Sequence, residues 1–132
     1  MDGELKQIWD EDSHETNEQE FDSQGINGLL YIAGPYRAKT VNGVRRNIRK
    51  AEMVMEWAWV NGWIPVCPHL NSAFVDGLVP DEMILKRYLR LLTRCDAILM
   101  MKGWQDSEGA KDEYMLARNY IGIRVLDDPL EE

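Results

Sequence analysis

Two short apolar runs, each followed by a glycine-containing loop and then an amphipathic stretch, constrain the fold of this chain most strongly. Residues 29–33 end at Gly34 and Pro35, and residues 96–101 lead into a loop that begins near Gly103. A continuous apolar run of this length, stopped by turn residues, is typical of a central strand that is buried on both faces. We therefore expect two strands of an open sheet, each followed by a loop and a helix.

The stretches between and after these runs predict three helices and two further strands. The first helix should end at Gly62, where a left-handed cap is favourable, and the others should cover residues 80–94 and run from about residue 107 to 120. Residues 63–68 read as a strand whose prolines favour an edge position, and residues 123–126 as a last strand. The first helix shows the 3.6-residue spacing at Ile48, Ala51, Met55, Ala58 and Trp59.

Strands that alternate with helices predict a sequence of βαβ units with right-handed crossovers. The fold class is accordingly α/β: a small doubly wound, flavodoxin- or Rossmann-like sheet, mainly parallel, with strand order 2-1-3-4 and helices on both faces. In that order the chain reverses direction between the first and third strands, and ligands bind outside their carboxyl ends. The loops at residues 34–40 and 102–113 should meet there.

Charge divides the chain into two parts. Residues 1–27 contain nine Asp or Glu and one Lys, whereas residues 28–132 contain fourteen residues of each sign. We expect residues 1–27 to be a mostly disordered acidic tail and residues 28–132 to form one domain. The balanced charge of the domain does not favour binding of a nucleic-acid polymer.

No apolar run is long enough to cross a bilayer, and the acidic N-terminus is unlike a signal peptide, so we expect a cytoplasmic protein without a membrane partner. Cys67 and Cys95 form no Cys-x-x-Cys pair and should be buried free thiols. Cys67 and His69 alone do not make a metal-ligand set, and no dinucleotide Gly-x-Gly-x-x-Gly occurs. We expect neither a metal nor a cofactor.

The loop before the third helix carries the clearest indication of a site. Ser107 is a plausible N-cap, and the free N–H groups of the first helical turn favour an anion that the Gly109 backbone can approach closely. Glu113 lies about one turn into the helix and should lean back toward the loop. The alternative needs no ligand: Ser107 caps the helix, and Glu113 is an acid that the helix dipole favours.

The loop after the first strand is basic. Between Arg37 and Lys50 there are six Arg or Lys residues and no acid. Arg37 could bind a phosphate or carboxylate as a fork, although a solvated helix face would explain most of these charges. His69 follows the second strand, where it either faces the ligand-binding edge or serves as a hydrogen-bonded structural residue.

With both loops considered, the chain resembles the nucleoside 2-deoxyribosyltransferase-like family, which includes the deoxynucleoside 5′-monophosphate N-glycosidases. The resemblance runs from about Leu29 to Leu126, and the Ser-x-Gly-x-x-x-Glu spacing is its most specific part. The residues that carry it are Tyr31-Ile32-Ala33-Gly34-Pro35-Tyr36, Cys95-Asp96-Ala97, Gly103-Trp104 and Ser107-x-Gly109-Ala110-x-x-Glu113.

The resemblance implies an activity and roles for individual residues. Glu113 would be the nucleophile that cleaves the N-glycosidic bond of a nucleoside or its 5′-monophosphate, through a glycosyl-enzyme resolved by water or by a second base. Ser107 and Gly109 would hold the 5′-phosphate. The other nucleotide-contacting loop would comprise Gly34, Pro35, Tyr36 and Arg37. The family also commonly completes its site across a dimer, so a homodimer or larger homo-oligomer is expected.

One departure from the family concerns the proton of the leaving base. Where the family usually has an aspartate eight residues before Asp96, this chain has Tyr88, which is a weaker proton shuttle near neutral pH. Asp96, Asp76 or His69 could serve instead, and Asp96 could equally start a strand and hydrogen-bond neighbouring backbone.

Two alternatives to an enzyme stay open at this point. One is a catalytically inactive nucleotide-binding or regulatory module, which the tyrosine at position 88 would permit. The other is an interaction protein whose acidic tail is the active part, since a fold does not prove a function.

Overall fold

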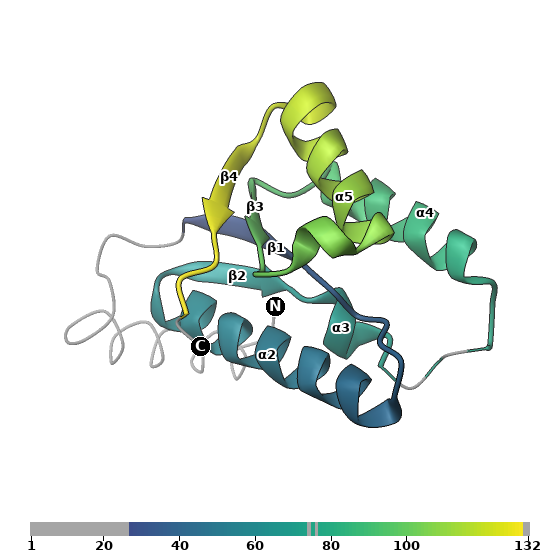
Figure 1. Ribbon diagram of the computed structural model, residues 1–132. Helices are drawn as coiled ribbons and strands as arrows, with labels where there is room; N and C mark the ends of the chain where they lie inside the picture. The colour runs from purple at the N-terminus through teal and green to yellow at the C-terminus, as the bar shows by residue number, and fades with distance from the viewer. Residues whose placement is uncertain (1–26, 74, 76, 131–132) are drawn as a thin grey trace, which may run out of the picture.

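The computed structural model describes residues 27–130, except residues 74 and 76, and the acidic segment at residues 1–26 lies outside this part (Figure 1). Four parallel strands form one sheet in the order β2-β1-β3-β4, which confirms the predicted topology. The edge position of β2 is also as predicted, because it pairs only with β1. The strands are β1 (Gly28–Ala33), β2 (Trp63–Val66), β3 (Ala97–Met100) and β4 (Arg124–Asp127).

Helix α2 (Val41–Val60) covers one face of the sheet, and α4 (Asp81–Leu92) and α5 (Glu108–Met115) cover the other (Figure 1). The sequence sets both ends of α2. Thr40 is its N-cap and accepts a hydrogen bond from the Gly43 backbone N–H at 3.0 Å. Gly62 follows the end of the helix with φ of +88°, a conformation in which a side chain would be strained.

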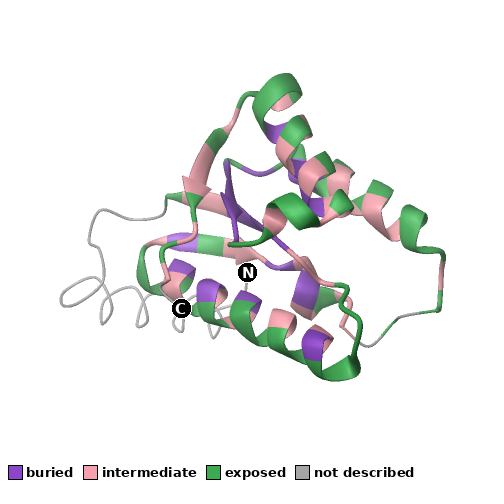
Figure 2. Ribbon diagram, viewed as in Figure 1, coloured by how far each residue is buried: buried purple, intermediate pink, exposed green. Residues whose placement is uncertain are grey.

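Alternating side chains of the central strands build two separate cores, and Figure 2 shows these strands buried while the outer helix faces are exposed. Leu30 and Ile32 pack toward α2, with Ala51, Val54 and Ala58 of that helix. The other face of the sheet packs against α4 and α5 through a second cluster: Tyr31, Ala33, Leu92, Cys95, Ile98, Met100, Ala110 and Ala117.

The two cysteines are buried and free, as predicted. Cys67 belongs to the cluster on the α2 face and Cys95 to the cluster on the opposite face, so the sheet separates them. Burial raises the pKa of both thiols, that of Cys95 to about 11. They therefore behave as small apolar core residues.

Two short elements were not predicted: α3 (Pro68–Asn71) and a 3₁₀ turn at Trp104–Asp106. The third helix was predicted to extend to about residue 120, and its part at Leu116–Ile121 is π-helical. Trp59, one of the periodic apolar positions of the first helix, is 56% exposed, because it lies about 100° around α2 from the buried Ala58. Within the described residues, no helix combines the length and the apolar character that a bilayer-spanning helix needs.

Asp96 ties the two central strands together at their amino ends. Its Oδ2 accepts a hydrogen bond from the Leu29 backbone N–H at 2.8 Å, and its own backbone N–H donates to the Leu29 carbonyl oxygen at 2.9 Å. The Gly28 backbone runs so close to this carboxylate that a Cβ at position 28 would lie 2.5 Å from Oδ2. The side chain therefore has a local structural role where β1 and β3 begin.

We predict that Asp96→Ala lowers the free energy of unfolding by about 1–2 kcal/mol, because it removes a charge-assisted hydrogen bond to backbone at a partly solvated site. Urea denaturation at pH 7 measures the change. Asp127→Ala is the matched control, since Asp127 is exposed at the end of β4 and its side chain has no hydrogen bond to the described residues. Equal stability of the two variants would contradict this role for Asp96.

Candidate functional site

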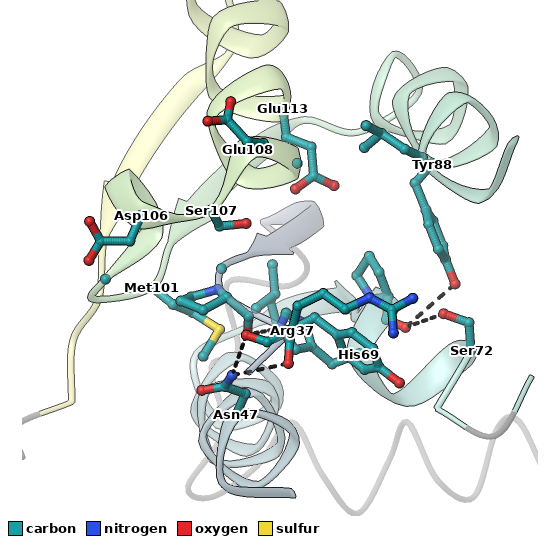
Figure 3. Close-up of a pocket in the computed structure, with 18 of the residues that line it drawn as sticks. Arg37, Asn47, His69, Ser72, Tyr88, Met101, Asp106, Ser107, Glu108 and Glu113 are labelled. Atoms are coloured by element: carbon teal, nitrogen blue, oxygen red, sulfur yellow. Dashed lines mark hydrogen bonds between the residues drawn. The ribbon is translucent and has the colours of Figure 1, made fainter. Parts of the chain in front are cut away.

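A cavity of about 960 Å³ opens where the carboxyl ends of β1 and β3 meet, and the two loops predicted to converge both line it (Figure 3). The cavity also receives side chains from α2, α3, α4 and α5. Nine of the ten residues predicted for the site line it: Gly34, Pro35, Tyr36, Arg37, His69, Tyr88, Ser107, Gly109 and Glu113.

Glu113 is the one buried carboxylate of the described residues, with 7% of its surface exposed. Its Oε2 accepts a short hydrogen bond from the Tyr31 hydroxyl, and its carboxylate points into the cavity (Figure 3). Burial raises the pKa of Glu113 to about 7, the Tyr31 hydrogen bond opposes this rise, and the nearby Asp112 adds to it. Burial and the adjacent carboxylate in turn raise the pKa of Tyr31, so the phenol stays protonated and donates.

The first turn of α5 forms one wall of the cavity. Ser107 caps the helix as predicted, because its Oγ accepts from the Ala110 N–H at 3.2 Å. Gly109 lies in the same turn, and a Cβ added there would meet only Leu85 Cδ1, at 3.7 Å. Packing within the protein therefore does not require a glycine at this position, although glycine costs a helix about 0.5–1 kcal/mol relative to alanine. The absent side chain keeps the cavity wall open.

Gly34 has a different reason to be glycine. A Cβ at this position would lie 2.6 Å from Met101 Cβ, so the loop after β1 can pass β3 only without a side chain. Asn47 of α2 fastens the same loop by donating from Nδ2 to the Tyr36 carbonyl oxygen at 3.0 Å. The loop is thus held at its start by packing and farther on by a hydrogen bond.

Arg37 and Tyr36 form the rim on this side. Arg37 donates to Asp81 Oδ1 at 2.7 Å and joins the loop to the first turn of α4. Its guanidinium also lies over the Tyr36 ring, 5.3 Å from the centroid. With side-chain exposures of 58% and 67%, Arg37 and Asp81 form an ion pair that contributes little to stability.

His69 and Tyr88 occupy the side of the cavity opposite α5. His69 is 5% exposed and donates from Nε2 to the Pro35 carbonyl oxygen at 2.8 Å. This hydrogen bond connects α3 to the loop after β1. Burial lowers the pKa of His69, so its ring is neutral at pH 7. The Tyr88 hydroxyl accepts from Asn71 Nδ2 at 2.9 Å.

Comparison with protein-family models matches residues 29–127 to a family described as a domain of unknown function, DUF4406. The match covers most of the chain, including both cavity loops. The chain belongs to this family. No curated protein matches it.

In this DUF4406 chain, the structure separates Asp96 from the other predicted residues. Asp96 lies at the amino end of β3, opposite the cavity, and it is not among the lining residues. Asp96 was one of the catalytic candidates, but it does not lie at the site. A residue just before a parallel strand lies at the edge of the sheet away from the ligand. Asp76 lies outside the described residues.

The sequence did not single out Asn47, Ser72 or Leu85, which also line the cavity of this DUF4406 domain. Asn47 alone could have been noticed, because asparagine is unfavourable within a helix unless its side chain has a partner. Among the described residues, no three His, Cys, Asp or Glu side chains are grouped so that they could hold a metal ion.

The buried carboxyl group makes stability depend on pH in a defined direction. Because the pKa of Glu113 is about 7 in the folded state and 4.5 as a model value, raising the pH between these values deprotonates the unfolded chain first. Stability should fall across this interval by about 3 kcal/mol. Glu113→Gln should lack this contribution and become more stable than wild type by pH 8. The free energies of unfolding of wild type and Glu113→Gln can be measured in urea from pH 5 to pH 8. If the two proteins changed in parallel with pH, the raised pKa of Glu113 would be contradicted.

Proposed function

We propose that this protein cleaves the N-glycosidic bond of a nucleoside 5′-monophosphate or nucleoside, by hydrolysis or by base exchange. One observation carries the proposal: Glu113, a buried carboxylate held by Tyr31, points into a cavity large enough for a nucleotide (Figure 3). Burial of a carboxyl group is unfavourable for folding, and such groups cluster at functional sites. The resemblance to the nucleoside 2-deoxyribosyltransferase-like family supports the same assignment at the same residue.

The mechanism is a double displacement at C1′. A Glu113 oxygen attacks C1′ while the bond from C1′ to the base breaks, and the base leaves with the bonding electron pair. The hydrogen bond from Tyr31 orients the carboxylate and leaves its second oxygen for attack. Water, or a second base, then attacks C1′ from the face opposite Glu113 and loses a proton. The ester bond breaks, and its electron pair returns to the Glu113 carboxylate. The configuration at C1′ is retained.

The wall at the start of α5 is suited to the 5′-phosphate of the substrate. Ser107 and Gly109 lie at the N-terminus of an eight-residue helix, where unpaired N–H groups and the helix dipole favour an anion. The Ser107 hydroxyl points into the cavity (Figure 3), and its proton is available because the oxygen is the acceptor in the cap. Lys50 adds a positive charge on the lining.

A second candidate is a nucleotide-binding module without turnover. The observation that favours it is the position of Tyr88, whose hydroxyl is held at α3 by Asn71 and so does not replace the acid found in the related enzymes. Such a protein would bind nucleotides saturably and release no base.

The first test is release of free base from a panel of ribo- and deoxyribonucleotides and their nucleosides, followed by chromatography with and without a second base. We expect wild type to release base and Glu113→Gln to be slower by roughly 10³-fold or more, since the nucleophile is lost. A new nucleoside that forms only with added base would identify a transferase. Saturable binding without release from any compound would favour the binding module.

Gly109→Ala separates ligand binding from folding. The variant should be more stable by about 0.5–1 kcal/mol, because alanine favours the helix and its Cβ fits. We expect KM for 5′-monophosphates to rise roughly tenfold, as if one charge-assisted hydrogen bond were lost, while KM for the nucleosides changes little. Equal increases in KM for nucleotides and nucleosides would contradict binding of the 5′-phosphate at the start of α5.

A further inference from the structure

Among the residues that the structure describes, the interior of the cavity has a nucleophile but no carboxyl, imidazole or phenol group whose proton is free for a leaving base. Cleavage of an ordinary N-glycoside leaves a base that needs a proton, and a positioned acid contributes about 10²–10⁴-fold to such a step. A side chain that supplies this proton must carry it free inside the cavity.

The titratable proton donors that the structure describes in the interior are engaged, and the Ser107 hydroxyl, whose proton is available, is too weak an acid to protonate a leaving base. The Tyr31 hydroxyl donates to Glu113, and Nε2 of His69 donates to the Pro35 carbonyl oxygen at 2.8 Å. The Tyr88 hydroxyl accepts from Asn71, and its own proton is directed at the Pro68 carbonyl oxygen at 3.5 Å. Tyr88 therefore presents its ring, and not its proton, to the cavity.

The remaining carboxyl groups of the lining lie at its rim. Asp81 accepts from Arg37, and Glu108 pairs with Lys111 at 3.0 Å. The carboxylates of Asp106 and Glu108 point away from the cavity (Figure 3). Glu82, which is exposed in the first turn of α4, forms no ion pair with the described residues and is the rival acid among them.

We propose that the preferred substrate is a nucleotide whose base already carries a positive charge, such as a pyridinium or an N7-alkylated purinium N-glycoside. This inference rests on the proposed function. When Glu113 attacks C1′, the electron pair of the breaking bond neutralises the ring nitrogen, and the base leaves neutral without gaining a proton. Water then adds at C1′, the ester bond to Glu113 breaks, and one proton is released to solvent.

The charges and rings of the lining agree with such a substrate. The Glu113 carboxylate attracts a cation inside the cavity, and the aromatic residue Tyr88 belongs to the lining. A cationic heterocycle interacts with an aromatic ring more favourably than a neutral one does. The rim carries charges of both signs, and its positive side chains include Arg37, which is half-exposed and paired with Asp81, and Lys50, which is exposed. A substrate with a cationic base and an anionic phosphate matches this arrangement.

The test uses a matched pair of probes that differ by one methyl group, 7-methylguanosine 5′-monophosphate and guanosine 5′-monophosphate, with nicotinamide mononucleotide as a pyridinium probe. We expect the full chain to have a kcat/KM at least about 100-fold higher for the cationic compounds, the contribution of the missing acid. For nicotinamide mononucleotide, whose pyridinium charge does not change with pH, kcat/KM should rise through pH 7 as Glu113 ionises, then stay level to pH 9. Glu113→Gln should abolish release from all three.

Two outcomes would overturn the inference. Comparable kcat/KM values for the two guanosine compounds, with the value for guanosine 5′-monophosphate falling at least roughly tenfold in Glu82→Gln, would identify Glu82 as the acid. The proposed function would then stand, and the preference for a charged base would not. No release from any probe, or from any member of the wider nucleotide panel, would instead overturn the proposed function and the inference with it.

Discussion

The hydrogen bond between Tyr31 and Glu113 is the interaction on which the site depends. It joins the middle of the central strand to the second turn of α5 across a buried core. Tyr31 is fully buried in β1, so its hydroxyl is a fixed donor, and the carboxylate that accepts from it is held at the base of the cavity. Without this donor the carboxylate would lose its partner in a poorly solvated place, where an unpaired charge is strongly unfavourable.

The cavity exists because two loops of different construction meet at the carboxyl edge of the sheet. The loop after β1 is crowded: Gly34 passes against Met101, and Asn47 and His69 bind its carbonyl groups. The start of α5 is open, because a Cβ at Gly109 would meet only Leu85 Cδ1, at 3.7 Å, among the described residues. Rigid support on one side and free space on the other is the arrangement expected of a preformed binding site.

Sequence patterns predicted the sheet, its strand order and most of the lining. They did not predict α3, because its four residues are too few to show a helical periodicity. For Asp96 they left two roles open, an acid of the site or a residue that starts a strand and hydrogen-bonds backbone, and the structure shows the second arrangement. Nearby in sequence, Asp96 and Gly103 lie at opposite edges of the sheet, since β3 runs between them.

The sequence by itself determined the α/β class, the parallel order and the meeting of the two loops, because hydrophobic periodicity and glycine positions are local properties that each segment carries alone. Only the tertiary structure decided which polar groups pair. The partner of Glu113 is 82 residues away in the chain, and the partners of Tyr88 and His69 lie on other elements. Such pairings depend on distances between elements, and no local pattern encodes those distances.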